Sequence, residues 1–333
     1  MAIDAGDANV WNAKGIALSA LGRHEGAIGC WDKALAVDAR HTNAWYNKGD
    51  SLLALGQHEE AIGCYDKLLA IDPRHARAWI NKGNALGALS HHRKAIDCYD
   101  KVLAIDPRCV DAWYNEGTSL QILGRHEEAI RCYDKVLAIN PLFANGWYNK
   151  GNALRAIGQH EEAGACYDQA LAIDPRHAGA WNNKGMALQA LGRDEEAVGC
   201  HERALAIDPQ HAPAWTSMGY ALDTLGRQEE AIESYNKALA IDPRCVTAWY
   251  NKGILLRTLR RHEEAVACLD RVLAIHPRDV GAWLNKAQSQ DLLNNQREAM
   301  SSYRKFIELA PPQYGRQIAV ARQRLHKLEA KRI

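Results

Sequence analysis

Two helical patterns of apolar residues, separated by a short break, fill residues 42–75. In the first, apolar positions recur every three or four residues, as on one face of a helix: Trp45, Gly49, Leu52 and Leu55. The second has similar spacing: Ala61, Ile62, Cys64, Tyr65, Leu68, Leu69 and Ile71. Gly56 and Gln57 lie in the break, because a glycine there ends the first helix. Asp72-Pro73 ends the second helix, because the residue before a proline avoids the α region. The pattern predicts a hairpin of two helices.

This hairpin pattern recurs every 34 residues without insertion or deletion. Its tryptophan marks nine copies: Trp11, Trp45, Trp79, Trp113, Trp147, Trp181, Trp215, Trp249 and Trp283. The expected repeats are residues 8–41, 42–75, 76–109, 110–143, 144–177, 178–211, 212–245, 246–279 and 280–313. Tandem hairpins bury their apolar faces against their neighbours, so the sequence predicts an all-α solenoid.

Large and small residues alternate where the two helices of a hairpin would meet. Gly49 recurs in phase in eight of the nine copies, although glycine inside a helix costs roughly 1 kcal/mol against alanine. Close approach of the second helix must offset that cost, and Ala61 and Tyr65 of the second helix supply the small and large partners. We therefore expect the two helices to interlock at Gly49.

These positions closely resemble the tetratricopeptide repeat (TPR) family, in particular tandem arrays of the prokaryotic type. The family pattern reads here as Trp45, Gly49, Leu52, Gly56, Ala61, Tyr65, Leu68 and Pro73, and it recurs along almost the whole chain. The resemblance implies a right-handed superhelical solenoid whose first helices line a concave groove. One departure is the residue before the helix glycine, which is usually apolar in the family and is lysine in seven copies here.

The two ends of the chain differ from the repeats. Residues 1–7 carry Ala2-Ile3-Asp4, which matches the end of a second helix and suggests the remnant of a preceding repeat or simply a start. Residues 314–333 place Ile318, Ala321, Leu325 and Leu328 on one stripe of an amphipathic helix. We expect this helix to cap the last repeat; a basic docking helix for an acidic partner or a membrane surface is the alternative.

Composition excludes several classes of partner. The net charge is +1, which gives no general reason to expect binding to nucleic acid or to a membrane surface. No apolar run approaches the roughly 18 residues of a membrane span. Asp4 and Asp7 interrupt any secretory signal. We therefore expect a cytoplasmic protein.

Cysteine and histidine are numerous but occupy equivalent positions in successive repeats. Seven of the nine cysteines come directly before the second-helix aromatic position, as Cys64 does before Tyr65. Equivalent atoms of packed helices are about 8–10 Å apart, too far for a disulfide or for shared metal ligands. Cys109 and Cys245 lie in turns and are expected to be more exposed. With no nucleophile or phosphate motif either, we predict free thiols, no metal, no cofactor and no enzyme activity.

The lysine ladder consists of Lys14, Lys48, Lys82, Lys150, Lys184, Lys252 and Lys286, with Glu116 and Met218 as exceptions. The lysine ammonium groups can pair with a series of aspartates in the second helices, while the lysine stems cover apolar surface. Alternatively, the lysines can form a basic track. The near-neutral net charge of the chain favours pairing with the acid ladder Asp32, Asp66, Asp100, Asp134, Asp168 and Asp270.

An asparagine stands two residues after the tryptophan in most repeats, on the face that the resemblance places in the groove. This amide ladder consists of Asn47, Asn81, Asn115, Asn149, Asn183, Asn251 and Asn285. A carboxamide both donates and accepts hydrogen bonds, so it can bind a peptide backbone. Some long TPR superhelices use a similar ladder; a solvated side chain copied by duplication is the alternative. We expect alanine at Asn115, Asn149 and Asn183 to weaken peptide binding without harming the fold.

Aromatic and basic residues surround the amide ladder. Tyr46, Tyr114, Tyr148 and Tyr250 stand one residue after the tryptophan, and Arg155 and Arg257 stand eight after it. The positions that carry lysine and arginine in the family's carboxylate clamp hold tyrosine and asparagine here, so chaperone-tail binding is not expected.

Together these features predict a non-enzymatic scaffold that binds an extended segment of a protein or peptide in the groove. One alternative is a structural module that self-associates end to end through an open N-terminal end or belongs to a longer array. Another is the regulatory TPR segment of a larger enzyme. Protein size at increasing concentration separates a monomeric binder from a stacking module.

Overall fold

The computed structural model describes residues 7–330, which form nineteen α-helices, one short 3-10 helix and no strand. The all-helical fold predicted from the sequence is confirmed. Packing contacts divide the chain into two compact units, residues 1–173 and 174–333. The repeat pattern, which continues unchanged across residues 173 and 174, does not predict this division.

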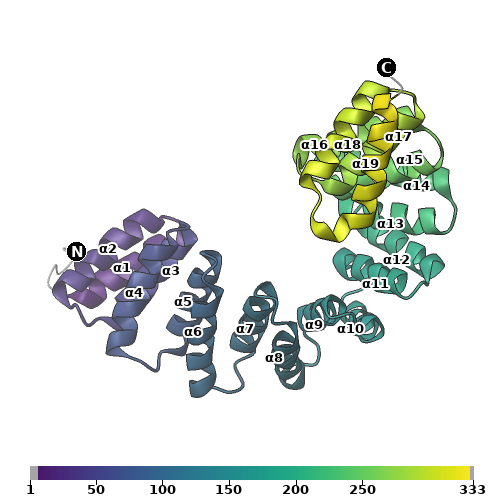
Figure 1. The fold of residues 1–333 in the computed structure, drawn as a ribbon. Helices are drawn as coiled ribbons and strands as arrows, with labels where there is room; N and C mark the ends of the chain where they lie inside the picture. The colour runs from purple at the N-terminus through teal and green to yellow at the C-terminus, as the bar shows by residue number, and fades with distance from the viewer. Residues whose placement is uncertain (1–6, 331–333) are drawn as a thin grey trace. The chain divides into compact units, whose positions relative to one another are not determined.

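The first unit contains ten helices of similar length (Figure 1). They are α1 (Ala8–Ala20), α2 (His24–Val37), α3 (Thr42–Ala54), α4 (His58–Ile71), α5 (Ala76–Ala88), α6 (His92–Ile105), α7 (Val110–Ile122), α8 (His126–Ile139), α9 (Ala144–Ala156) and α10 (His160–Ile173). Odd-numbered helices carry the tryptophan pattern and are called first helices here; even-numbered ones are second helices.

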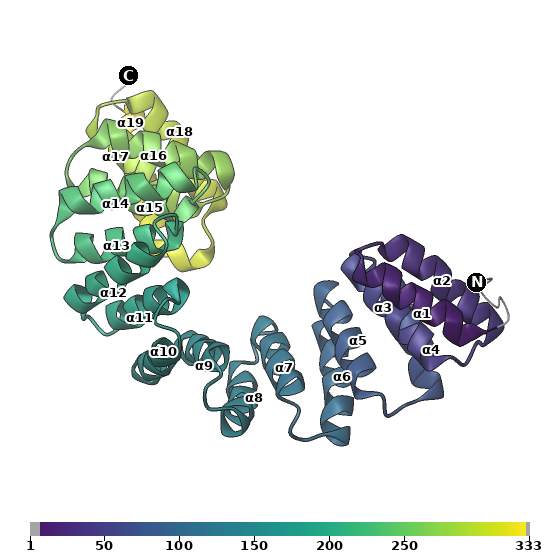
Figure 2. The same cartoon turned by 180° about the vertical axis from the view of Figure 1, so that it is seen from behind.

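The second unit continues the alternation and ends in an additional helix (Figure 2). It contains α11 (Ala178–Ala190), α12 (Asp194–Ile207), α13 (Ala212–Thr224), α14 (Gln228–Ile241), α15 (Val246–Thr258), α16 (His262–Ile275), α17 (Val280–Leu292), α18 (Gln296–Leu309), the 3-10 helix η1 (Pro312–Tyr314) and α19 (Gly315–Ala330). The helices of each pair lie side by side, as α13 and α14 do in both views.

The close approach predicted at the helix glycine is present. A Cβ atom added to Gly49 would lie 2.7 Å from Cε1 of Tyr65, a residue of α4 that is fully buried. Leu68 and Ala61 pack in the same cluster. The glycine therefore leaves room for the aromatic ring between α3 and α4.

Hydrogen bonds at the turns join successive repeats. His75 precedes α5 and accepts a hydrogen bond at Nδ1 from the backbone N–H of Ala78, at 3.1 Å; His41, His177 and His211 do the same in their repeats. A side-chain acceptor before a helix satisfies one of its free N–H groups. Trp79 donates from Nε1 to the carbonyl of Pro73, at 2.9 Å. Trp79 is half-buried, and this hydrogen bond ties the edge of its ring to the turn between repeats.

The contacts between repeats distinguish the two kinds of helix. In the first unit α1, α3, α5 and α7 each contact the next first helix, and in the second unit α11, α13 and α15 do so. No second helix in residues 7–330 has its backbone as close to the next second helix. Because the first helices are closer together, they form the inner side of the curve within each unit.

The predicted apolar stripe of α19 packs on the last repeat. Ala321 and Leu328 are buried with Phe306 of α18. Arg324 forms an ion pair with Asp291 at the end of α17, and its Nη2 lies 2.7 Å from Oδ1. That α19 acts as a cap stays a prediction. The resemblance of Ala2-Ile3-Asp4 to a second helix concerns residues outside the described part of the chain.

Candidate functional site

The amide ladder lies on the inner, first-helix side of each unit, and five of its seven side chains donate hydrogen bonds to the preceding repeat. Asn81 of α5 donates from Nδ2 to Oδ1 of Asp50, at 2.7 Å, and to the hydroxyl of Tyr46, at 3.2 Å. A carboxylate can only accept, so the Asn81 amide must turn its nitrogen toward Asp50. The same kind of donation joins Asn47 to Asn12, Asn115 to Asn84, Asn149 to Tyr114 and Asn285 to Tyr250.

These bonds bear on two expectations about the ladder. At Asn81 and Asn149 the side chain is half-buried and bonded rather than freely solvated. That alanine at Asn115, Asn149 and Asn183 leaves the fold unharmed stays a prediction, and a bonded amide such as Asn149 contributes roughly 0.5–1.5 kcal/mol net against it. Only half of the carboxamide is used, however. Within residues 7–330, Oδ1 of Asn81, Asn115 and Asn149 accepts no hydrogen bond.

A polar residue five positions after the tryptophan completes the network, and sequence reasoning did not assign it this role. Asp50 accepts from the Tyr65 hydroxyl at 2.6 Å as well as from Asn81. Asn84 does the same for Tyr99 and Asn115. The sequence did carry a signal for this role, because the polar residue is lost together with the second-helix tyrosine. Met186 takes its position in the repeat that carries His201, and Ile254 takes it in the repeat that carries Leu269.

The groove tyrosines are half-buried supports of the ladder. Tyr46, Tyr114 and Tyr148 pack against the second-helix tyrosines, with ring centroids 6.1–6.2 Å apart. Burial raises the pKa of the Tyr46, Tyr114 and Tyr250 hydroxyls, so these groups stay protonated at neutral pH. The exposed parts of the rings offer apolar surface beside the amides.

Arg155 and Arg257 lie in the last turns of α9 and α15. Both side chains are half-buried, and the Nε atom of each is buried without a hydrogen-bond partner in residues 7–330. A guanidinium suits a carboxylate. The exposed part of each guanidinium, rather than its buried Nε, can therefore contact an acidic side chain of a partner.

The thiols and imidazoles do not assemble into a reactive centre in the part of the chain that the structure describes. All nine cysteines are free, and burial raises the pKa of Cys64, Cys98 and Cys166 to about 11, which disfavours the nucleophilic thiolate. Cys109 and Cys245 are more exposed than the rest, as expected for turns. No group of three or more His, Cys, Asp or Glu side chains in residues 7–330 can hold a metal ion.

The lysine ladder pairs with the acid ladder of the preceding second helix. Lys48 lies 2.5 Å from Asp32 and Lys82 lies 2.6 Å from Asp66; Lys150 with Asp134 and Lys286 with Asp270 repeat the pair. These lysine side chains are only 17–21% exposed, and several ammonium groups also lie over the tryptophan ring. The pairing interpretation is confirmed at these repeats, and a basic track is not formed by them.

Sequence comparison places the chain in a family. Models described as tetratricopeptide repeat match residues 12–79, 216–279 and 250–314, residues 176–244, and residues 76–109, 110–143 and 144–177. The first of these models alone covers half of the chain. The chain belongs to the tetratricopeptide repeat family. TPR repeats mediate contacts between proteins, using the extended surface that stacked repeats create.

Two solved structures share this fold. A TPR protein from Parabacteroides merdae is 17% identical, with a TM-score of 0.57 over 76% of this chain and 97% of that one. The Cut9-Hcn1 tetramer of the APC/C is 18% identical, with a TM-score of 0.60 over 84% of this chain and 55% of that one. YrrB, described as a TPR protein with an unusual peptide-binding site, is 25% identical, with a TM-score of 0.48 over 56% and 97%. No curated protein sequence matches this TPR protein.

Among residues 7–330, no helix of the TPR array combines the length and the apolar character that crossing a membrane requires.

Proposed function

We propose that this TPR protein is a non-enzymatic scaffold that binds an extended segment of another protein along its first helices. The observation that carries the proposal is the half-used amide ladder of the first unit. Asn81, Asn115 and Asn149 donate from Nδ2 to the preceding repeat, while Oδ1 of each accepts no bond from residues 7–330. Each amide thus presents one acceptor to a backbone N–H of the bound segment.

The internal bonds of the ladder favour such binding because they hold the side chains in place beforehand. Ordering a free side chain on binding costs roughly 0.5–1.5 kcal/mol, and the Asn81 amide, held by Asp50 and Tyr46, has already lost that freedom. Packed helices are about 8–10 Å apart, which about three residues of an extended chain span. One backbone donor per repeat is therefore compatible with the ladder.

The surroundings of the ladder supply the side-chain contacts of the segment. The half-buried rings of Tyr46, Tyr114, Tyr148 and Tyr250 offer apolar surface. Arg155 is half-buried and carries a positive charge in the last turn of α9, so we expect the segment bound by the first unit to favour an acidic residue near α9. Asn183, Asn251, Asn285 and Arg257 form the corresponding face of the second unit.

The experiment selects random linear peptides displayed on phage against the intact protein and measures the affinity of the selected peptides. Asn115→Ala removes the free acceptor together with one internal bond. We expect it to weaken binding by about 3- to 10-fold, the effect of one hydrogen bond of roughly 1 kcal/mol. Asn81→Ala, Asn115→Ala and Asn149→Ala combined should weaken binding by roughly 10- to 1,000-fold.

Asn84→Ala is the matched control. It removes the acceptor of the Asn115 amide and of the Tyr99 hydroxyl, so it disturbs the scaffold at least as much as Asn115→Ala, yet it leaves Oδ1 of Asn115 in place. Asn84→Ala should weaken binding less than Asn115→Ala, because it loses only the prior ordering of the Asn115 amide and keeps the acceptor itself. A loss in Asn84→Ala as large as that in Asn115→Ala would mean that the ladder only supports the fold, and the proposal would be abandoned.

A further inference from the structure

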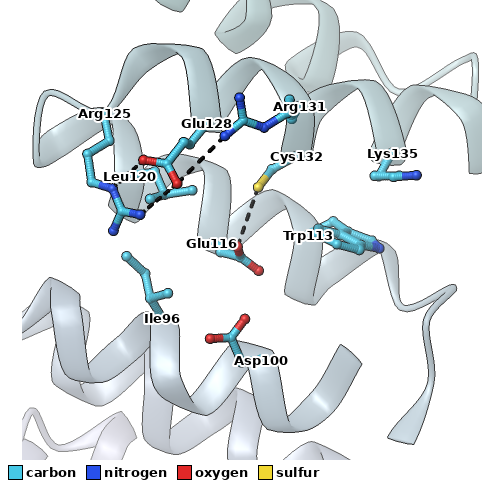
Figure 3. A pocket seen from close by; sticks show the side chains of 10 residues that line it. All are labelled: Ile96, Asp100, Trp113, Glu116, Leu120, Arg125, Glu128, Arg131, Cys132 and Lys135. Carbon is cyan, nitrogen blue, oxygen red and sulfur yellow. Dashed lines mark hydrogen bonds and ion pairs between the residues drawn. The ribbon is translucent and has the colours of Figure 1, made fainter. Parts of the chain in front are cut away.

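A pocket of about 390 Å³ lies between α6, α7 and α8, away from the amide ladder (Figure 3). The repeats before it have an equivalent pocket between two second helices and a first helix: Lys48 and Cys64 line the one of about 460 Å³, and Lys82 and Cys98 line the one of about 370 Å³. In those pockets the ladder lysine supplies an ammonium, which pairs with the aspartate of the preceding second helix.

The pocket between α6 and α8 lacks this ammonium because Glu116 takes the place of the lysine. Glu116 is 9% exposed, and its Oε1 accepts a weak hydrogen bond from the Cys132 thiol at 3.6 Å. Its Oε2 is buried without a partner in residues 7–330. Figure 3 shows its carboxylate and that of Asp100 facing each other from α7 and α6. Two carboxylates therefore meet where the other repeats hold an ion pair.

No cation in residues 7–330 forms an ion pair with Glu116 or Asp100, although the charge of Arg125 lowers the pKa of both carboxyls and that of Lys101 lowers the pKa of Asp100. Arg125 donates to both oxygens of Glu128, at 2.6 and 2.7 Å, and Arg131 lies 3.7 Å from the same carboxylate. Lys135 points away from Glu116 and Asp100 (Figure 3). Burial, and then the charge of Asp100, raise the pKa of Glu116 to about 7. Burial also raises the pKa of Asp100. Compared with the neighbouring repeats, this site therefore lacks the lysine ammonium that pairs with the aspartate.

We propose that this pocket binds a primary ammonium group, supplied by a lysine side chain of a partner or by a small alkylamine, between Glu116 and Asp100. The ammonium would occupy the part of the pocket that the lysine ammonium fills in the neighbouring repeats, where it lies 2.5–2.6 Å from the aspartate. It carries three donors, enough for Oε2 of Glu116 and for Asp100. Charge-assisted bonds of this kind are stronger than neutral ones. The site does not depend on the proposed peptide face, because it uses none of the ladder amides.

Calorimetric titration at low salt, where screening is weak, tests the site. The probe is Nα-acetyl-lysine methylamide, and the matched control is the same molecule acetylated at Nε. We expect saturable binding of the amine alone, together with a fall in the pKa of Glu116 measured by carboxyl NMR. Glu116→Gln removes the charge, and Glu116→Lys restores the ladder pair, so each should weaken binding by roughly 10- to 100-fold, the worth of a hydrogen bond to a charged group.

Glu116→Lys also controls for folding, since the same arrangement is present at Lys48 and Lys82, and its thermal unfolding should match or exceed that of the wild type. A second titration with 1,5-diaminopentane distinguishes the sources: tighter binding of the diamine points to a free amine, and tighter binding of a lysine-containing peptide points to a protein. No binding by the wild type, or binding by both variants as tight as that of the wild type, would overturn the proposal.

Discussion

Gly49 and Tyr65 set the distance between the two helices of their repeat. The ring of Tyr65 occupies the volume that a side chain on Gly49 would need, and its hydroxyl donates to Asp50, one residue further along α3. The aromatic ring therefore fills the space beside the glycine and bonds to the first helix at the same time. Repeat six lacks both parts of the polar pair, because His201 and Met186 replace them.

Gly49→Ala is expected to lower the free energy of unfolding by about 1–3 kcal/mol. The added Cβ atom would lie 2.7 Å from Cε1 and 2.8 Å from Cζ of the fully buried Tyr65, and overpacking of this kind outweighs the better helix propensity of alanine. Gly63→Ala in α4 is the control, because nothing lies within 4 Å of its added Cβ; it should raise stability by up to about 1 kcal/mol. Urea denaturation measures both, and a neutral Gly49→Ala would contradict the packing argument.

His201 is expected to make the fold sensitive to acid. It is fully buried, both ring nitrogens lack a partner in residues 7–330, and burial lowers its pKa to about 4. The unfolded chain gains a proton near the ordinary pKa of 6.5 while the native chain does not, so the contribution to stability is present above about pH 6.5 and is lost as pH falls toward about 4. The loss is roughly 3 kcal/mol.

His201→Leu, which copies the Leu269 that lies opposite Gly253 in repeat eight, should remove this loss. The measurement is the difference in urea midpoint between wild type and variant at several pH values, which cancels the contribution of all other groups. A difference that does not change between about pH 7 and pH 4 would show that the histidine is not buried as a neutral ring.

The first helix of each repeat ends in a left-handed residue. Six glycines have φ between 72° and 82° at this position: Gly22, Gly56, Gly124, Gly158, Gly192 and Gly226. The other three repeats reach the same conformation with Ser90, Arg260 and Asn294, at φ of 57–62°. Left-handed backbone costs a residue with a Cβ atom roughly 1–2 kcal/mol, so these helix ends carry strain that the glycines avoid.

Arg260→Gly should therefore raise the free energy of unfolding by about 1 kcal/mol. The side chain of Arg260 is exposed, so its removal costs little packing. Gly56→Ala is the opposite change at an equivalent site, with nothing within 4 Å of the added Cβ, and should lower stability by a similar amount. Thermal unfolding of the two variants measures these effects. Shifts of equal sign would refute the conformational explanation.

Within each unit the repeats contact only their neighbours, so stability depends on each repeat having another surface against it. The last repeat obtains this surface from α19. Its Ala321 and Leu328 are 1% and 2% exposed against α18, whereas Val320, beside this stripe, is 59% exposed. The helix thus has one covered face and one open face, as a cap requires.

Truncation after Tyr314 is expected to lower the melting temperature and to cause self-association, because it uncovers Phe306 and Met300 and leaves the largely buried Asp291 without Arg324. Leu328→Ser in the intact chain should cost about 2–3 kcal/mol, and Val320→Ser less than about 0.5 kcal/mol. Calorimetry and light scattering provide the measurements. A truncated protein as stable and as monomeric as the full chain would favour the docking interpretation of α19.

Periodicity predicted most of the fold, and the family resemblance supplied the expected place of the candidate site. The bounds of α3 and α4 agree with the two apolar patterns to within about a residue, because helix faces and helix ends depend on residues close together in sequence. The same phase placed Asn81 and Asn149 on the first-helix side. The role of Asp50 was missed, although its replacement by Met186 in the repeat that carries His201 was visible in the sequence.

What the sequence by itself determined is the set of local properties that repeat every 34 residues: helix length, the buried face and the turn between hairpins. The tertiary structure decided which polar atoms meet across repeats. Asn81 bonds to Asp50, 31 residues earlier, and Glu116 faces Asp100 on another helix, and neither pairing follows from a pattern within one helix. A hydrogen bond or a shifted pKa depends on separations of a few tenths of an ångström and on exclusion of water. Those quantities exist only once the repeats are packed together.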